Sequence, residues 1–344
     1  MANKKLLLAM AVMALVLAMT ATGCGKGKNN ATAAESAKAP ETSKAADTKS
    51  SGGKTSGDWT TVDVSSIFSS VSKIIYGNNK FFAVGYSGKN CAVAYSSDGV
   101  KWTAIDANSI FGNTYSSAIV YGNDKFIAVN SGRVAYSSDG IKWTAIEASL
   151  DSTGSIAFGN GMFVASSGAY SSDGITWKPT NISPSSHVEV VAFGKDMFIA
   201  GTNPGLRYSP DGIKWTSVND FPLRRQTFWA IAYGNGKFVA GGTNKDMAYS
   251  SDGINWTATD TGTAFAFTSD GKTDYAYKRA AAYGNNKFVA GGRAGVMATS
   301  PDGITWTAVK DSPFGAEDVV WAIAFGNGTF VAGSDSGKLA YSKK

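Results

Sequence analysis

From Asp58 onward, short apolar segments alternate with turns rich in glycine, asparagine and aspartate. A representative stretch is Ala230-Ile231-Ala232-Tyr233, followed by Asn235-Gly236 and then by Lys237-Phe238-Val239-Ala240-Gly241. Asn-Gly supplies the two residues with positive φ that a type I′ hairpin turn needs. Turn signals recur at intervals of about 8–12 residues, and helical periodicity is absent. The pattern therefore predicts an all-β protein of short antiparallel strands, without helices.

The apolar segments belong to a long repeat. Its first half is an aromatic residue, a glycine and an asparagine or lysine, followed by an aromatic strand. Seven copies span 249 residues, so the six intervals average about 41 residues, a period typical of propeller blades with four strands. The copies begin at Tyr76, Tyr121, Phe158, Phe193, Tyr233, Tyr283 and Phe325.

The second half of the repeat reads Ser-x-Asp-Gly-x-x-Trp and occurs six times. An aspartate in such a turn accepts backbone N–H groups, and the glycine takes the left-handed conformation. We expect the tryptophans to pack between neighbouring sheets. The aspartates are Asp98, Asp139, Asp173, Asp211, Asp252 and Asp302, and the tryptophans are Trp102, Trp143, Trp177, Trp215, Trp256 and Trp306.

Six second halves stand against seven first halves, and the mismatch predicts how the ring closes. The chain stops after Leu339-Ala340-Tyr341-Ser342, which corresponds to the third strand of a blade. The segment Asp58-Trp59-Thr60-Thr61-Val62 matches the fourth strand of the other repeats. We therefore predict a seven-bladed β-propeller of four-stranded blades, in which the N-terminal strand completes the last blade and removes an open edge.

The six-copy motif resembles the Asp-box, or bacterial neuraminidase repeat, over essentially all of residues 58–344. Sialidases share this repeat, but their Phe/Tyr-Arg-Ile-Pro motif does not occur here and their propellers have six blades. Two other resemblances are to the photosystem II assembly factor propellers, which bind protein partners, and to xyloglucanase propeller domains, which bind long glycans. The six equivalent aspartates lie on different blades, so we expect them to be structural rather than catalytic.

The N-terminus predicts export and lipid anchoring. Lys4 and Lys5 precede an apolar run, Leu6 to Met19, that is too short to span a bilayer stably. The run ends in Ala21-Thr22-Gly23-Cys24, which resembles a bacterial lipobox and implies diacylation of Cys24. We expect a signal peptide over 1–23, a lipid-anchored disordered tether over 24–57 and the propeller over 58–344, held at the outer face of a bacterial membrane.

Charge and residue counts exclude several classes of function. The net charge of +6 belongs mostly to the signal and the tether, because residues 58–344 hold 24 basic and 23 acidic side chains. This balance argues against nucleic-acid binding. His187 is the one histidine, so we expect no metal site, and no phosphate-binding glycine loop opens a helix, so we expect no cofactor. Cys91 lies in an apolar segment and is expected to be buried.

Candidate binding residues come from the position four before each aromatic-glycine pair. That position holds two tryptophans, an arginine and a glutamate where the framework would accept a small residue. We expect the chain connections between blades to lie on the same face, and the longest of them are Thr259 to Lys278, Asp220 to Phe228 and Asp311 to Asp318. The predicted patch comprises Trp229, Trp321, Arg279, Arg224, Arg225 and Glu189. The alternative is that both tryptophans pack between blades.

The sequence therefore favours a monomeric, non-catalytic binding protein. Its partner is either a protein or a cell-surface glycan, and a protein partner is the favoured hypothesis. A glycan site should offer exposed, parallel aromatic rings, whereas a protein site should be a mixed patch. A glycosidase would further need two carboxylates about 5–9.5 Å apart. The candidates for such a pair are Glu189, Asp220, Glu317 and Asp318.

Overall fold

The computed structural model describes residues 55–56, 58–111, 118–130, 132–148, 150, 154–182, 187–223 and 226–343. The predicted signal peptide, Cys24 and the tether up to residue 54 lie outside the described residues. Among the helices of the described part, none has the length and apolar character needed to cross a membrane.

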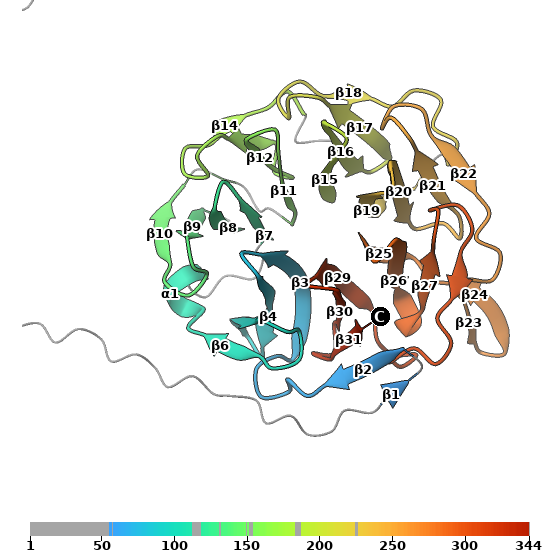
Figure 1. The fold of residues 1–344 in the computed structure, drawn as a ribbon. Coiled ribbons are helices and arrows are strands. Elements are labelled where there is room, and N and C mark those ends of the chain that lie inside the picture. Colours follow the sequence, from blue (N-terminus) through green and yellow to red (C-terminus); the bar gives the residue numbers. More distant parts are fainter. Residues whose placement is uncertain are drawn as a thin grey trace, which may run out of the picture. The chain divides into compact units, whose positions relative to one another are not determined.

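Seven antiparallel sheets stand around a centre as the blades of a β-propeller, which confirms the predicted fold (Figure 1). The first strand of each blade is innermost, and the fourth is outermost in every blade except the seventh, whose sheet has a fifth strand at its outer edge. Blades one to three consist of β3 (Ser70–Gly77), β4 (Lys80–Ser87), β5 (Asn90–Ser96) and β6 (Thr103–Ile105); β7 (Ala118–Gly122), β8 (Lys125–Asn130), β9 (Arg133–Ser137) and β10 (Thr144–Glu147); and β11 (Ile156–Gly159), β12 (Met162–Ala165), β13 (Ala169–Ser171) and β14 (Lys178–Pro179).

Blades four to seven follow the same plan, with one extra hairpin of two strands, β23 (Ala266–Ser269) and β24 (Lys272–Tyr275), between blades five and six. Their strands are β15 (Val190–Gly194), β16 (Met197–Thr202), β17 (Gly205–Ser209) and β18 (Thr216–Ser217); β19 (Phe228–Gly234), β20 (Lys237–Gly242), β21 (Met247–Ser250) and β22 (Thr257–Thr259); β25 (Lys278–Gly284), β26 (Lys287–Gly292), β27 (Met297–Ser300) and β28 (Thr307–Ala308); and β29 (Val320–Gly326), β30 (Thr329–Ser334), β31 (Leu339–Lys343), β2 (Trp59–Val62) and β1 (Thr55–Ser56).

Two single-turn helices in the described residues correct the expectation that the chain has none. They are α1 (Asn108–Phe111) and the 3₁₀ helix η2 (Arg293–Gly295). In α1, the N–H groups of Ile110 and Phe111 donate to the carbonyl oxygen of Ala107, and both side chains are buried between blades one and two. A helix of four residues has no repeat of apolar positions, so periodicity does not detect it.

The N-terminal strand closes the ring as predicted. Thr60, Thr61 and Val62 of β2 pair with Tyr341, Ala340 and Leu339 of β31. Trp59 is buried and packs with apolar residues of blades six and seven. The sheet also gains β1, which pairs with β2, so it begins at Thr55 rather than at Asp58.

The aromatic-glycine pairs form a continuous inner ring. A Cβ added to Gly234 would lie 1.9 Å from Cγ of Tyr283, the aromatic residue of the next blade. The same contact occurs at all seven blades, and it ends with Gly326 against the ring of Tyr76. Each glycine therefore provides the space in which its neighbour's aromatic side chain packs, and the last contact joins blade seven to blade one.

The Ser-x-Asp-Gly turns are held by their own hydrogen bonds. In the turn of blade three, Asp173 Oδ1 accepts the N–H groups of Ile175 and Thr176 at 2.8 and 2.7 Å, and the Ser171 hydroxyl at 2.8 Å. The other five aspartates accept the corresponding three bonds. These carboxylates are engaged in holding their turns.

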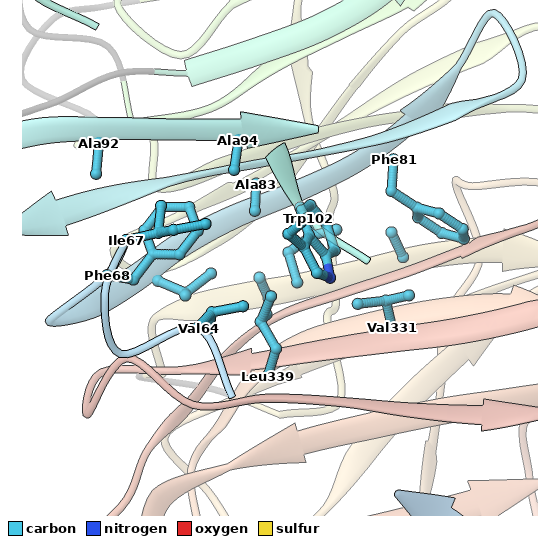
Figure 2. Packing of buried hydrophobic residues seen from close by; sticks show 14 residues of the cluster. Val64, Ile67, Phe68, Phe81, Ala83, Ala92, Ala94, Trp102, Val331 and Leu339 are labelled. Atoms are coloured by element: carbon cyan, nitrogen blue, oxygen red, sulfur yellow. The ribbon is translucent and has the colours of Figure 1, made fainter. Parts of the chain in front are cut away.

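The tryptophan that follows each turn packs against the preceding blade. Trp102 is fully buried, with Phe81 of blade one on one side and Val331 and Leu339 of blade seven on the other (Figure 2). Its indole N–H donates to the carbonyl oxygen of Gly99 at 3.1 Å. The tryptophans thus form the hydrophobic contact between adjacent blades, as the repeat predicts.

Acid is expected to weaken these turns. Burial raises the pKa of Asp173, but the N–H groups of Ile175 and Thr176 and the Ser171 hydroxyl outweigh it and lower the pKa to about 2. The unfolded value is about 3.9, so the stabilisation is complete above about pH 4 and is lost as the pH falls toward about 2. We predict that Asp173→Asn lowers the stability of the protein at pH 7 by roughly 1 kcal/mol.

Thermal unfolding of both proteins at pH 7 and at pH 2 checks this prediction. The difference between wild type and Asp173→Asn should shrink at pH 2, where the wild-type carboxylate has become partly protonated. An equal difference at the two pH values would show that the charge of Asp173 does not hold the turn.

Candidate functional site

The predicted patch lies where the innermost strands begin. Trp229, Arg279 and Trp321 are the second residues of β19, β25 and β29. Glu189 comes directly before β15, and its N–H donates to the carbonyl oxygen of Gly201. Arg224 and Arg225, which the sequence also assigned to the patch, lie outside the described residues.

A β-bulge presents each of the three patch residues that lie within a strand. The register of the first two strands shifts at Trp229, Arg279 and Trp321, and also at Ser72 of blade one. A bulge leaves its extra residue unpaired and re-aims the side chain, a device common beside binding sites. Trp229, Arg279 and Trp321 are therefore built into the sheets rather than carried on loops.

A glycine on the second strand makes room for the bulge in three of these four blades. A Cβ on Gly242 would lie 1.9 Å from the carbonyl oxygen of Thr227, and one on Gly292 would lie 1.7 Å from that of Tyr277. Gly85 has the same relation to Ser70. Side chains at these positions would push the backbone of the first strand away.

The residues at the starts of the inner strands surround a cavity of about 380 Å³. This volume falls within the range of small-molecule sites, about 300–1,000 Å³. Blades one, three, four, five, six and seven all contribute to it. Its lining consists of Ser70, Ser72, Lys73, Tyr86, Gly154, Glu189, Trp229, Arg279, Trp321 and Asp335.

Arg279 lies between the two tryptophans of the patch. Its guanidinium carbon is 3.7 Å from the centre of the Trp229 ring and 4.5 Å from that of Trp321. Such cation–π contacts gain strength when they are removed from water. Burial lowers the pKa of Arg279, an effect opposed by the charge of Glu189, and its Nε is buried without a hydrogen-bond partner. Both tryptophans therefore contact an arginine that lines the cavity.

Lys73 is a cavity residue that the sequence argument missed. It follows the bulge residue Ser72, one position beyond the position that was compared around the ring. Burial and the charge of Arg279 lower the pKa of Lys73, while Glu189 raises it. Lys73 is the one charged residue at this position, because the other blades have Ala118, Ser155, Val190, Ala230, Ala280 and Ala322.

Replacing Lys73 with methionine is expected to stabilise the fold. The substitution keeps most of the apolar stem and removes the charge of a side chain that is half-buried in the cavity. We predict that Lys73→Met raises the free energy of unfolding by about 1–2 kcal/mol, measured by urea denaturation at pH 7. A variant less stable than wild type would show that the Lys73 charge supports the fold.

A row of aromatic and basic side chains extends from the cavity toward the hairpin β23–β24. The rings of Trp229 and Tyr277 are 5.9 Å apart, and the Arg293 guanidinium carbon is 5.6 Å from the centre of the Tyr277 ring. The same carbon is 5.3 Å from the Phe267 ring, and Arg293 forms an ion pair with Asp274 at 3.5 Å. The row links the cavity to the longest connection between blades.

Several aromatic residues in the long connections belong to the core instead of the surface. Phe221, Phe265 and Phe314 are all buried. Phe265 packs against Trp306 with ring centres 5.6 Å apart. The buried Lys278 at the end of the same connection donates to the carbonyl oxygens of Asn244 and Lys245, and burial lowers the pKa of Lys278 to about 7. These buried parts of the long connections therefore pack against the blades and extend the hydrophobic core.

The predicted carboxylates do not gather. Glu189 lines the cavity, whereas Asp318 is buried and bonds to Lys338 at 2.7 Å. Asp220 and Glu317 are exposed and are absent from the cavity lining. A carboxylate that the sequence argument did not select, Asp335, lines the cavity, and its Oδ1 accepts the N–H of Val319 at 2.7 Å.

Metal ligands are not clustered in the part of the chain that the structure describes: no group of three or more His, Cys, Asp or Glu side chains there could hold an ion. His187 is exposed and has a positive φ of 38°. Cys91 is buried among apolar residues of blades one and two, as expected.

Residues 55–158 match the DUF6242 β-propeller domain family. No curated protein matches the sequence. Among solved structures, YCF48 bound to D1 peptide is 14% identical, with a TM-score of 0.64 over 85% of this chain and 99% of that one. YCF48 from Cyanidioschyzon merolae is 19% identical, with a TM-score of 0.61 over 83% and 98% of the two chains. A catalytically inactive virginiamycin B lyase from Staphylococcus aureus is 11% identical, with a TM-score of 0.66 over 83% and 99%. At these identities, the likenesses show a common propeller fold.

Proposed function

We propose that this protein is a non-catalytic binding protein whose propeller holds a protein partner at the cavity where the inner strands begin. The stack of Trp229, Arg279 and Trp321 carries the proposal. A sugar-binding platform offers open aromatic faces, whereas here the guanidinium lies against both indoles. A mixed surface of arginine, tryptophan and carboxylates is typical of the hot spots of protein interfaces.

The exposure of the stack supports this proposal. Trp321 is 37% exposed, and it is the one aromatic residue among the exposed large hydrophobic residues of the described part. The neighbouring row of Tyr277, Arg293 and Phe267 extends the surface outward. A propeller of similar fold, YCF48, carries a bound peptide, which is consistent with an extended polypeptide as the ligand here.

The proposal places the propeller outside the cell. The apolar run after Lys4 and Lys5, and the small residues before Cys24, support export and acylation. Two acyl chains would keep the binding surface stably at the outer face of a bacterial membrane, whereas a single acyl chain would anchor the protein only reversibly. The six turn aspartates are held by backbone hydrogen bonds, which supports a structural rather than a catalytic role for them.

Site-specific photo-crosslinking in the native membrane tests the proposal. A photoreactive amino acid at position 321 of the full chain should give a discrete protein adduct that survives treatment with glycosidases. The same amino acid at position 141 is the matched control, because Ile141 is 44% exposed and belongs to a turn of blade two. A glycan adduct at position 321, or equal protein adducts at both positions, would contradict the proposal.

A further inference from the structure

Two cations in the cavity take part in no ion pair among the described residues. Lys73 comes from β3 of blade one and Arg279 from β25 of blade six, and both line the same cavity. Ion pairs of the described part, such as Lys338 with Asp318 at 2.7 Å and Arg133 with Glu147 at 3.0 Å, lie elsewhere. The cavity thus brings two positive charges together without a carboxylate in direct contact with either.

This arrangement is costly, and Glu189, whose charge raises the pKa of both cations without forming an ion pair with either, offsets the cost only in part. Each cation disfavours the charged form of its neighbour, and the walls remove part of the water that would screen them. Burial lowers the pKa of Lys73, and the charge of Arg279, which lines the same cavity, lowers it further, while Glu189 raises it. An anion held between the two side chains would relieve the repulsion.

The stack also fixes how Arg279 can bind. The indoles of Trp229 and Trp321 lie against the guanidinium, so its edge remains for hydrogen bonds. The edge of a guanidinium matches the two oxygens of a carboxylate. An arginine already immobilised by two rings loses little conformational entropy when it binds a ligand.

The two acids of the cavity limit the charge of the anion. Glu189 and Asp335 line the same space and would repel an incoming negative group. The repulsion doubles for a dianion such as a phosphate monoester, whereas a carboxylate brings a single charge. The Ser70 and Ser72 hydroxyls, which also line the cavity, add neutral donors.

We propose that the cavity binds a carboxylate group of the partner polypeptide between Lys73 and Arg279. The inference rests on the proposed function, because it assumes a polypeptide ligand. The carboxylate comes either from the C-terminus of the partner or from an aspartate or glutamate side chain. Lys73 and Arg279 then supply the positive charge, and Trp229 and Trp321 hold the Arg279 guanidinium in position.

Fluorescence anisotropy with three pools of dye-labelled random peptides tests the inference on the full chain. The first pool has a free C-terminal carboxylate and no acidic residue, the second has an amidated C-terminus and acidic residues, and the third has neither. The proteins are wild type, Lys73→Met, Arg279→Gln and the control Lys214→Met, whose lysine is exposed on the turn of blade four. Thermal unfolding confirms that each variant is folded.

We expect the first or the second pool to bind wild type at least about tenfold more tightly than the third, because a charge-assisted hydrogen bond contributes about 1.5–3 kcal/mol. Lys73→Met and Arg279→Gln should remove that preference, and Lys214→Met should keep it. The pool that is preferred identifies the source of the carboxylate.

Three outcomes would overturn the inference, and they differ in what else they reject. Equal binding of all three pools, or an unchanged preference in Lys73→Met, would reject the carboxylate site and leave peptide binding intact. The absence of binding by every pool would reject the proposed function, and the inference with it.

Discussion

Gly234→Ala is expected to lower the free energy of unfolding by about 3 kcal/mol or more. The added Cβ would lie 1.9 Å from Cγ of Tyr283, well inside contact distance, and the ring has the inner strands of two blades around it. Because every blade repeats this contact, the collision cannot be relieved by moving one blade without disturbing the next. Urea denaturation followed by circular dichroism measures the effect.

Two comparisons show whether the contact with Tyr283 is responsible. Gly154→Ala is the matched control, since an added Cβ there meets nothing within 4 Å, and it should change stability by less than about 0.5 kcal/mol. Adding Tyr283→Ala to Gly234→Ala should destabilise the protein less than the sum of the two single substitutions. Additive effects would mean that the glycine and the ring do not act as a pair.

Deleting residues 55–62 is expected to abolish the closed ring. The deletion removes the strand that pairs with β31 and takes Trp59 out of the contact between blades six and seven. The loss of a buried tryptophan alone costs about 3–5 kcal/mol, and an exposed edge of β31 would invite aggregation. Thermal unfolding and size-exclusion chromatography should show a protein that is far less stable or aggregated.

A synthetic peptide of residues 55–62 provides the complementary result. Added in excess, it should restore the monomeric elution and raise the unfolding temperature of the truncated protein. A deletion of equal length within the predicted tether, residues 33–40, is the control and should leave the unfolding temperature unchanged. A truncated protein as stable as wild type would contradict closure by the N-terminal strand.

The repeat predicted the blades because its turns are local. Asn235-Gly236 and Ser250 to Gly253 contain the residues that fix their own backbone angles, so the sequence is sufficient there. Closure by Trp59 to Val62 was also predictable, because that segment repeats the fourth strand of every other blade. The short helix α1 has no repeat to compare with and was missed.

The site was only partly predictable, because its geometry depends on register. Comparing one position around the ring selected Trp229, Arg279 and Trp321, which the structure brings into contact. The bulges that present them arise from strand pairing, which no single segment encodes. Lys73 was missed because it lies one position beyond the one compared around the ring, at a position where the other blades have uncharged residues.

Binding of polypeptide and polysaccharide by the same two proteins tests the central claim most directly. Wild type and Trp229→Ala/Trp321→Ala would be titrated with the pools of acidic and free-carboxylate peptides, and with a panel of polysaccharides and peptidoglycan, while release of reducing ends is monitored. We predict saturable peptide binding that the double substitution removes, without saturable polysaccharide binding or sugar release. Saturable polysaccharide binding lost in the double variant would instead establish a carbohydrate module, and release of reducing ends would make it an enzyme.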